Sequence, residues 1–193
     1  HCMNWILLIL TLPTENATAR MRAWRTLKNS GAAVLRDGVY LMPEEGSGKA
    51  LLSDIAEDIE KNGGTTYLLS THADREAFAG MFDRSTEFAE LADAISKSRA
   101  GLTDDTAADT LKQSRKLRRS FEQLCAIDFF SGEAQRQTSS ALLDLESAAI
   151  RTLSPDEPHA MLGDTAMLSV ADYQKRVWAC LLYTSPSPRD ATL

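Results

Sequence analysis

Residues 4–43, NWILLILTLPTENATARMRAWRTLKNSGAAVLRDGVYLMP, decide the fold of this chain because they predict a strand, a helix and a second strand. The apolar run at 5–10 is short and unbroken, which is typical of a strand covered on both faces. Asn16 is expected to cap the helix, and Gly31 stands where a helix end turns left-handed. The apolar stripe of this helix is predicted at Ala17, Met21, Trp24 and Leu27.

The second strand is split into two apolar pieces, at 33–35 and 39–42. Arg36-Asp37-Gly38 between them predicts either a bulge or a tight turn. Ser47 is then expected to cap a second helix that ends at Asn62-Gly63-Gly64, and a Thr- and Tyr-rich third strand follows at 65–70. The order β-α-β-α-β, with no obvious fourth strand, predicts an α+β protein with a ferredoxin-like unit at 3–72.

A helical subdomain of about three helices is predicted for 73–153. The first helix is expected from Asp74 or Arg75 to Arg99, the second from near Thr106, and the third from about Glu133 to Leu153. Residues 154–158 are interpreted as a linker by composition. Residues 180–193 resemble a translated sequencing adaptor and are excluded from the fold prediction.

Composition limits the function classes. The longest apolar run, 5–10, is too short to cross a bilayer, so no membrane partner is expected. Three cysteines without metal-site spacing fit a reducing compartment, which suggests a cytoplasmic protein. The net charge of −6 and the pI near 5.1 argue against strong sequence-independent binding of nucleic acid by the chain as a whole.

Two local clusters of positive charge depart from that average. The first predicted helix carries Arg20, Arg22, Arg25 and Lys28 and has no acid between 16 and 29. Helical geometry places Arg22 and Arg25 together, away from Met21 and Trp24 and free to reach a partner. Arg20 falls inside the predicted apolar stripe, so it should be partly buried, paired with a carboxylate such as Asp37, or exposed at a sheet edge. A solvated basic face with one ion pair is the simpler interpretation.

The second cluster lies later in the chain and consists of Lys112, Arg115, Lys116, Arg118 and Arg119. Four of these lie opposite the predicted apolar positions of their helix. A solvated face is therefore favoured over a DNA or dimer contact.

The sequence contains no recognisable catalytic motif. A nuclease on such a sheet needs acidic metal ligands at the end of the first strand, where this chain has Thr11-Leu12-Pro13-Thr14. His72 and His159 lack partners at metal-ligand spacing, and Cys125 is expected to be a small core residue. With no phosphate-binding glycine loop and no C-x-x-C, we expect no catalytic residue, metal or cofactor. The same absence weighs against an oxidoreductase.

The segment LLILTLPTENATARMRAWRTLKNSGAAVLRDGVYLMP at 7–43, together with AIDFFSGEA at 126–134, resembles the N-terminal domain of the ChrB-like chromate-resistance regulators. The resemblance extends over about residues 3–179. It implies a bacterial, cytoplasmic, chromate-responsive transcriptional regulator that binds the promoter DNA of a chromate-efflux operon. It also implies that residues 154–179 are a linker and the start of a missing C-terminal domain, and that chromate acts as effector through that domain.

In that family the arginines of the first helix are those tied to DNA binding, and Arg20 and Arg22 match the motif. The predicted DNA-binding residues are therefore Arg20, Arg22, Arg25 and Lys28, in a homodimer because operators are usually two-fold. The alternative is a domain that binds no DNA and instead senses an oxyanion through Arg20, Arg22 and Arg25 or mediates a protein interaction.

Overall fold

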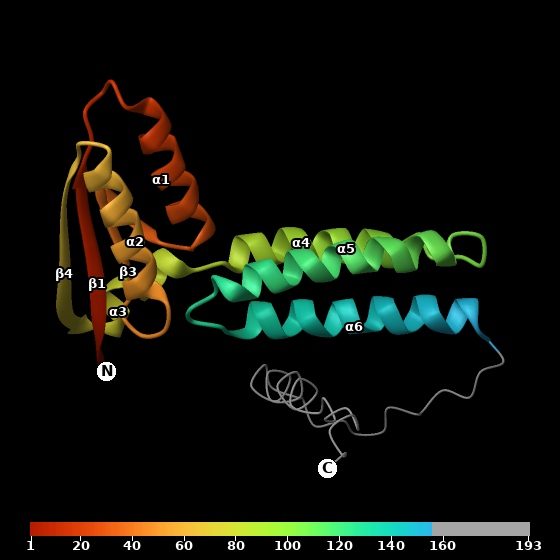
Figure 1. Ribbon diagram of the computed structural model, residues 1–193. Helices are drawn as coiled ribbons and strands as arrows, with labels where there is room; N and C mark the ends of the chain where they lie inside the picture. The colour runs from red at the N-terminus through yellow and green to blue at the C-terminus, as the bar shows by residue number, and fades with distance from the viewer. Residues whose placement is uncertain (156–193) are drawn as a thin grey trace, which may run out of the picture. The chain divides into compact units, whose positions relative to one another are not determined.

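The computed structural model describes residues 1–155, and their first half builds a four-stranded antiparallel sheet in the order β2-β3-β1-β4 (Figure 1). Two helices connect strands within this sheet. The elements are β1 (Cys2–Thr11), α1 (Ala17–Asn29), β2 (Ala33–Arg36), β3 (Val39–Pro43), α2 (Gly48–Lys61) and β4 (Thr65–Asp74). The prediction of a mixed chain of strands and helices is confirmed.

The sheet has one strand more than the sequence analysis expected, because the segment between β2 and β3 is a tight turn rather than a bulge in one strand. Gly38 has a φ of 75°, and a Cβ at this position would lie 2.6 Å from the Leu10 carbonyl oxygen. The backbone N–H of Leu10 donates to the Gly38 carbonyl at 2.8 Å. A left-handed glycine closing on the neighbouring strand therefore folds the segment into a hairpin.

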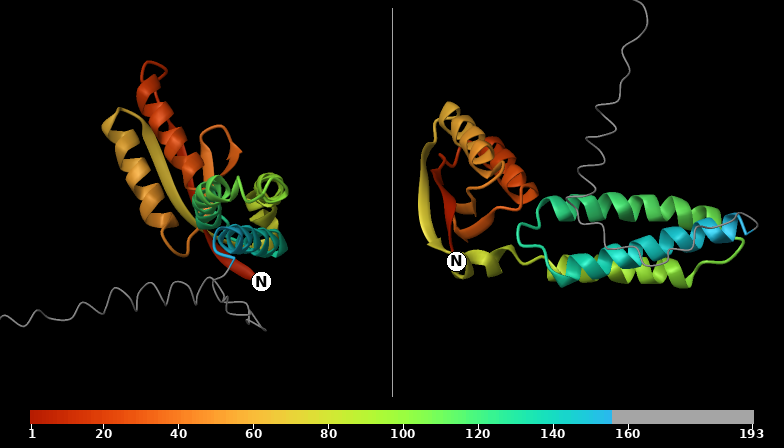
Figure 2. Two further views of the ribbon diagram at one scale, coloured as in Figure 1. Left: turned by 90° about the vertical axis from the view of Figure 1, so that its right-hand side faces the viewer. Right: turned by 90° about the horizontal axis from the view of Figure 1, so that it is seen from below.

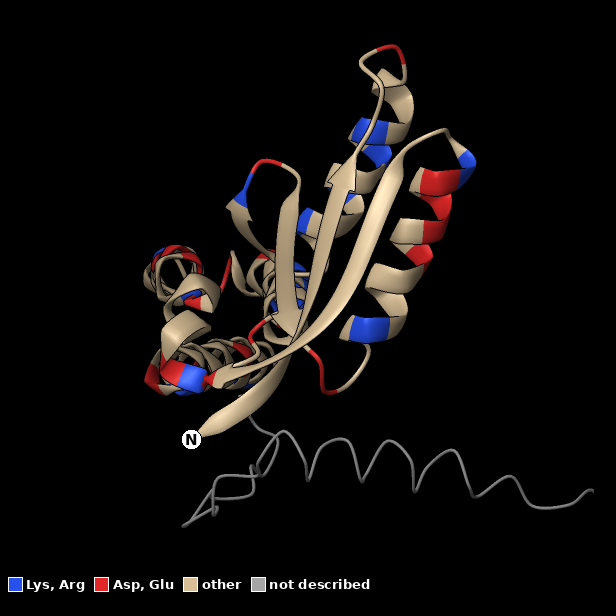
Figure 3. Ribbon diagram, turned by 90° about the vertical axis from the view of Figure 1, so that its left-hand side faces the viewer, with Lys and Arg blue, Asp and Glu red and all other residues tan. Residues whose placement is uncertain are grey.

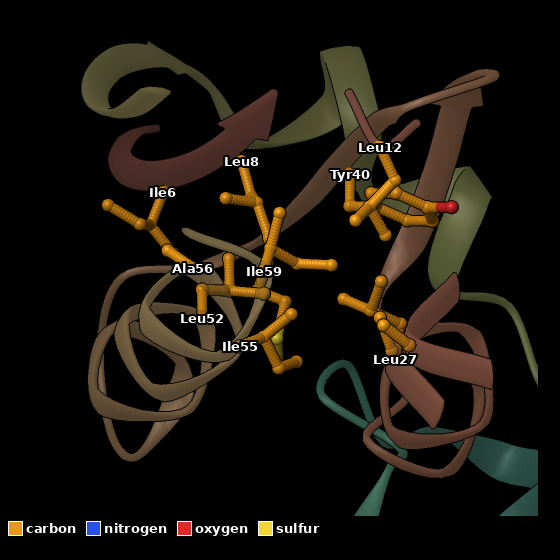
Figure 4. Packing of buried hydrophobic residues seen from close by; sticks show 12 residues of the cluster. Ile6, Leu8, Leu12, Leu27, Tyr40, Leu52, Ile55, Ala56 and Ile59 are labelled. Carbon is orange, nitrogen blue, oxygen red and sulfur yellow. The ribbon is translucent and has the colours of Figure 1, made fainter. Parts of the chain in front are cut away.

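One face of β1 supplies the core beneath the two helices. Ile6 and Leu8 of this face are almost completely buried and pack with Leu27 of α1 and Leu52 and Ile59 of α2 (Figure 4). Full burial of an aliphatic side chain of this size contributes about 1.5–3 kcal/mol. This face therefore fixes both helices on the sheet.

The opposite face of β1 is covered in its first half by aromatic residues from later in the chain. Trp5 is fully buried and lies 5.3 Å from Phe78, 5.7 Å from Phe82 and 6.0 Å from Phe130, measured between ring centroids. Offset and edge contacts at such distances are favourable for aromatic rings. The prediction that this strand is covered on both faces is confirmed for the part around Trp5.

The single helix predicted from Asp74 or Arg75 to Arg99 is wrong. The structure instead has α3 (Arg75–Ala79), a 3-10 turn η1 (Gly80–Phe82) and α4 (Ser85–Ala100). Asp83 is extended, and its carboxylate accepts hydrogen bonds of 2.9 Å from both the backbone N–H and the hydroxyl of Ser85. This local alternative to helical hydrogen bonding ends the first segment and lets Phe82 turn inward onto Trp5.

The two remaining helices follow the prediction closely, as α5 (Ala107–Ala126) and α6 (Glu133–Leu153). They lie alongside α4 (Figure 2). The helices share a core of apolar residues, namely Phe88, Ile95, Leu117, Phe121, Leu124, Leu142 and Leu145. The same periodic spacing that predicted the helices buries these side chains.

Gly31 is the point where the end of α1 meets the segment between α5 and α6. Its φ is 78°, as predicted for a left-handed helix end, and a Cβ there would lie 2.8 Å from the Cβ of Ile127. Arg84 donates to the Gly31 carbonyl at 3.2 Å. A side chain at this position is therefore excluded both by backbone conformation and by the close neighbour.

Residues 156–193 are outside the described part of the chain. The predictions for most of the linker, for the start of a further domain and for the adaptor-like segment lie there, as does His159. Within residues 1–155, no helix is both long enough and apolar enough to cross a membrane. The division at residues 72 and 153 stays a prediction.

Candidate nucleic-acid interface

Helix α1 packs on the sheet through its small residues. Its buried positions are Ala19, Ala23 and Leu27, whereas Met21 and Trp24 are 46% and 45% exposed. The predicted stripe through Ala17, Met21 and Trp24 is therefore wrong, and only Leu27 of that stripe points inward. Two alanines one turn apart allow the helix to approach its neighbours closely, which leaves the large side chains on the outer surface.

The outer surface of α1 is consequently basic and partly apolar. It carries no acidic residue, and its cations lie beside the exposed Met21 and Trp24. We call this surface the α1 face and define it by Arg20, Met21, Arg22, Trp24, Arg25 and Lys28. Figure 3 shows basic bands along α1 and mainly acidic bands along α2.

Arg20 does not pair with Asp37. Its Nη2 donates to the Leu12 carbonyl at 2.8 Å, and the residue is exposed. Of the three environments left open for Arg20, exposure is the one that the structure has. The bond to Leu12, which follows β1, holds one side of the guanidinium and leaves its remaining N–H groups available.

Arg20 and Asp37 nevertheless border the same pocket of about 410 Å³ between α1 and the β2–β3 turn, together with Trp24 and Tyr40. Burial raises the pKa of Tyr40, and the Asp37 charge raises it further while Arg20 opposes both effects. An anion in this pocket would meet Asp37 as well as Arg20.

Arg22 is paired with Asp58, which corrects the prediction that it can reach another partner freely. Its Nε donates to Asp58 Oδ2 at 3.0 Å and its Nη2 donates to Asp58 Oδ1 at 3.1 Å. Both groups are substantially exposed, and exposed ion pairs of this kind are worth about 0.2–1 kcal/mol. A phosphate could therefore compete with Asp58 for Arg22 at modest cost.

Arg25 and Lys28 complete the α1 face. Arg25 has no ion partner in the part of the chain that the structure describes, and it borders a shallow surface depression with Arg22 and Met21. The Lys28 ammonium lies 5.0 Å from the centroid of the Trp24 ring, a cation–π contact at the surface. Both cations can be approached from solvent.

The exposed Met21 and Trp24 are the residues of this surface that the sequence analysis missed. A competing signal was present in the spacing of Ala19, Ala23 and Leu27, which recur every fourth residue. Hydrophobicity favours Trp over Ala as a core residue, so the pattern alone selects the wrong stripe.

The cations of α5 form the second basic cluster, and one of them is paired with an acid of α6. Lys112, Arg115, Lys116 and Arg119 are exposed, as expected for a solvated face. Arg118 forms two hydrogen bonds with Glu146 of α6, at 3.0 and 2.7 Å. This pairing ties α5 to α6.

The remaining candidates have structural environments. His72 Nδ1 lies 2.8 Å from the side-chain oxygen of Asn4 on the neighbouring strand. Cys125 packs against the core of α4, α5 and α6, and burial raises the pKa of its thiol. Within residues 1–155, no three His, Cys, Asp or Glu side chains gather as ligands of a metal ion would.

Comparison with known proteins assigns the family. The family model described as "Protein ChrB, N-terminal" matches residues 20–151. The chain belongs to the ChrB family. The match includes the α1 face, the hairpin, β4 and the helices α4 to α6.

A curated relative of this ChrB-family chain is Protein ChrB from Cupriavidus metallidurans (strain ATCC 43123 / DSM 2839 / NBRC 102507 / CH34). The two are 38% identical over 179 residues, which cover 91% of this chain and 55% of the relative. The chain thus spans about half the length of the relative it matches.

A solved structure also resembles this one, that of uncharacterized protein Rv0674 from Mycobacterium tuberculosis. The TM-score is 0.47 at 16% identity, with 78% of this chain and 62% of the other covered. A likeness at this level carries no argument about function.

Proposed function

We propose that this ChrB-family chain is the DNA-binding part of a chromate-responsive transcriptional regulator of a chromate-efflux operon. It acts in the cytoplasm as a homodimer on promoter DNA. Chromate is the effector and acts through the part of the family's length that this chain does not span. The proposed role involves no catalysis and no cofactor.

The observation that carries the proposal is the α1 face. This surface presents three arginines and a lysine without a single acid in the helix, although the whole chain has a net charge of −6. Phosphate contacts from such cations supply affinity and position a protein on the duplex. The α1 face therefore gives an acidic protein a local site for this attraction.

The cations have distinct roles in this proposal. Arg25 and Lys28 contact phosphates directly because each is accessible from solvent. Arg22 exchanges the Asp58 carboxylate for a phosphate, and Arg20 reaches a phosphate with the N–H groups that Leu12 does not use. Trp24 and Met21 then lie where an apolar side chain can contact sugars or base edges.

The arrangement of the arginines disfavours the oxyanion-sensing alternative. Arg20 borders one pocket, whereas Arg22 and Arg25 border a separate depression. Asp37 also lines the pocket of Arg20 and would repel an anion. A compact oxyanion site needs convergent donors, and Arg20 lines a different pocket from Arg22 and Arg25.

We also infer that the sheet and its two helices belong to the ferredoxin-like class. The support is the order β1-α1-β2-β3-α2-β4, in which each helix connection skips one strand of the sheet. This is the split β-α-β arrangement of that class. It places both helices on one face and leaves the outer side of α1 accessible.

The proposal is tested by measuring the affinity of the full chain for DNA from a chromate-resistance promoter over a series of salt concentrations. An Arg25→Ala/Lys28→Ala variant should bind more weakly and show a slope of log K against log salt that is smaller by about 3.6, because two phosphate contacts are lost from each chain of the dimer at about 0.9 per contact. An Arg115→Ala/Lys116→Ala variant removes the same charge from α5 and should bind like the parent.

Three outcomes would contradict the proposal. One is that the folded full chain does not bind promoter DNA at low salt. A second is that both double variants weaken binding equally, which would assign the effect to net charge alone. A third is binding that does not depend on salt.

A further inference from the structure

Within residues 1–155, the outer edge of β4 has no partner strand. β4 pairs along one side with β1 over ten residue pairs, and no element of residues 1–155 pairs with its other side (Figure 1). We propose that this edge pairs with β4 of a second copy of the chain, in an antiparallel arrangement about a two-fold axis. The inference rests on the homodimer that the proposed function requires and names the surface that forms it.

An exposed edge of this length normally carries features that prevent pairing. Proteins protect such edges with charged residues, proline, bulges or a very short strand. Residues 65–73, TTYLLSTHA, contain no Lys, Arg, Asp, Glu or Pro, and their pairing with β1 shows no shift of register. The row of backbone donors and acceptors on this edge is therefore available to another strand.

The exposed side chains of β4 are complementary to themselves. Tyr67 and Leu69 are 60% and 48% exposed, and they share one face because they are two residues apart. An antiparallel pairing with the axis at Leu68 places Tyr67 opposite Leu69 of the second copy, and the reverse pair occurs on the other side of the axis. This register covers two large apolar side chains of each copy.

Charged residues of neighbouring elements lie beside the two positions that this axis exchanges. Thr66 donates to Glu60 at 2.5 Å, and Ser70 donates to Glu44 at 2.6 Å. Lys49 lies 3.7 Å from the same Glu44 oxygen. Because the axis exchanges positions 66 and 70, Glu60 of one copy falls beside the Glu44–Lys49 ion pair of the other, and Lys49 offsets the repulsion between the two carboxylates.

The dimer has a consequence for the α1 faces. Helix α2 contacts both β4 and α1, so α2 and its copy would lie between the two α1 helices. Three helix spacings of 8–10 Å give a separation of about 24–30 Å between the α1 helices. This approaches the distance of about 34 Å between successive turns of one DNA groove.

The test is the mass of the full chain in solution, measured without DNA by sedimentation equilibrium over a range of protein concentrations. The parent chain should reach the mass of two chains. Leu69→Glu should reduce it to one, because the carboxylate would be buried against Tyr67 of the other copy. Adding Tyr67→Lys to that variant should restore the dimer, since each lysine then faces a glutamate.

Leu143→Glu on α6 is the matched control, because Leu143 is a 55% exposed leucine remote in sequence from β4. It should leave the dimer intact. A parent chain that stays at the mass of one chain overturns the proposal, as does a dimer that survives Leu69→Glu or is lost equally in Leu143→Glu. Failure of the double variant to restore association overturns the register.

DNA binding is measured separately on the same samples. A dimer that binds no promoter DNA would refute the proposed function and leave the β4 interface standing. A monomer that binds DNA with a salt-dependent affinity would refute the interface and the homodimer and leave the DNA-binding role standing.

Discussion

Helices α1 and α5 are both rich in basic residues, yet the structure gives them opposite surroundings. α1 has four cations, no acid and a buried face made of two alanines and a leucine. α5 has five cations, two acids in its own sequence, and a buried face that includes Leu117, Phe121 and Leu124. The small buried face of α1 leaves its aromatic and sulfur-containing side chains beside its cations, whereas α5 buries its large side chains. Counting cations therefore does not identify a binding surface.

The largest effect is expected where α5 buries a large side chain. Phe121→Ala should reduce the free energy of unfolding by about 3–5 kcal/mol, because it removes an aromatic ring from the core shared by α4, α5 and α6. Urea denaturation of the full chain would measure it. A loss below about 1 kcal/mol would show that this core collapses around the gap or is not tightly packed.

The buried face of α1 should respond to enlargement. Ala19→Leu should lower the free energy of unfolding by about 1–3 kcal/mol, because Ala19 is buried in the core that α1 shares with the sheet and does not line the pocket beside Arg20. The same denaturation experiment applies. Ala17→Leu, on an exposed position of the same helix, is the control and should change stability by about 0.5 kcal/mol or less. Equal effects at the two positions would contradict the observed orientation of α1.

Substitution of Trp24 should affect DNA binding more than stability. Trp24→Ala should change the free energy of unfolding little, because almost half of this side chain is exposed. The same variant should weaken binding to promoter DNA by about 1–2 kcal/mol, because contacts with sugars or bases are lost. Fluorescence anisotropy with labelled DNA would measure the affinity. Unchanged affinity together with a large loss of stability would mean that Trp24 is a core residue, as its place in the sequence first indicates.

The smallest effect concerns the ion pairs that distinguish the two helices. Asp58→Asn should lower stability by less than about 1 kcal/mol and strengthen DNA binding, because Arg22 is released and a negative charge near the α1 face is removed. Glu146→Gln is the matched change beside Arg118 on α5 and should not strengthen binding. If both variants bind DNA more tightly to the same extent, net charge rather than the α1 face accounts for the effect.

Elements with strong periodicity and clear end signals were predicted well. Helix α6 was expected at about Glu133 to Leu153 and occurs there, because its apolar spacing is regular and Ser131-Gly132 precedes it. The helix break at Asp83 was missed, since it depends on hydrogen bonds to Ser85 and on the fit of Phe82 against Trp5. The contact between Phe82 and Trp5 joins residues that are far apart in the sequence, so a local sequence pattern does not predict it.

The candidate site was predicted in its location but not in its contacts. The basic helix and its four cations could be read from the sequence. The pairing of Arg22 with Asp58 could not, because the two residues are 36 positions apart and meet only when α1 packs beside α2. The exposure of Trp24 was missed because hydrophobicity ranks it above alanine for burial.

The sequence by itself determined which segments are strands and helices, where most of them end, and that the first helix carries cations without acids. Those properties follow from local spacing, turn residues and charge. Only the tertiary structure decided which side of α1 is buried, which arginine is paired and which strand edge is left open. Each of these depends on how closely distant segments approach one another, and a small residue such as Ala19 permits an approach that a larger one prevents.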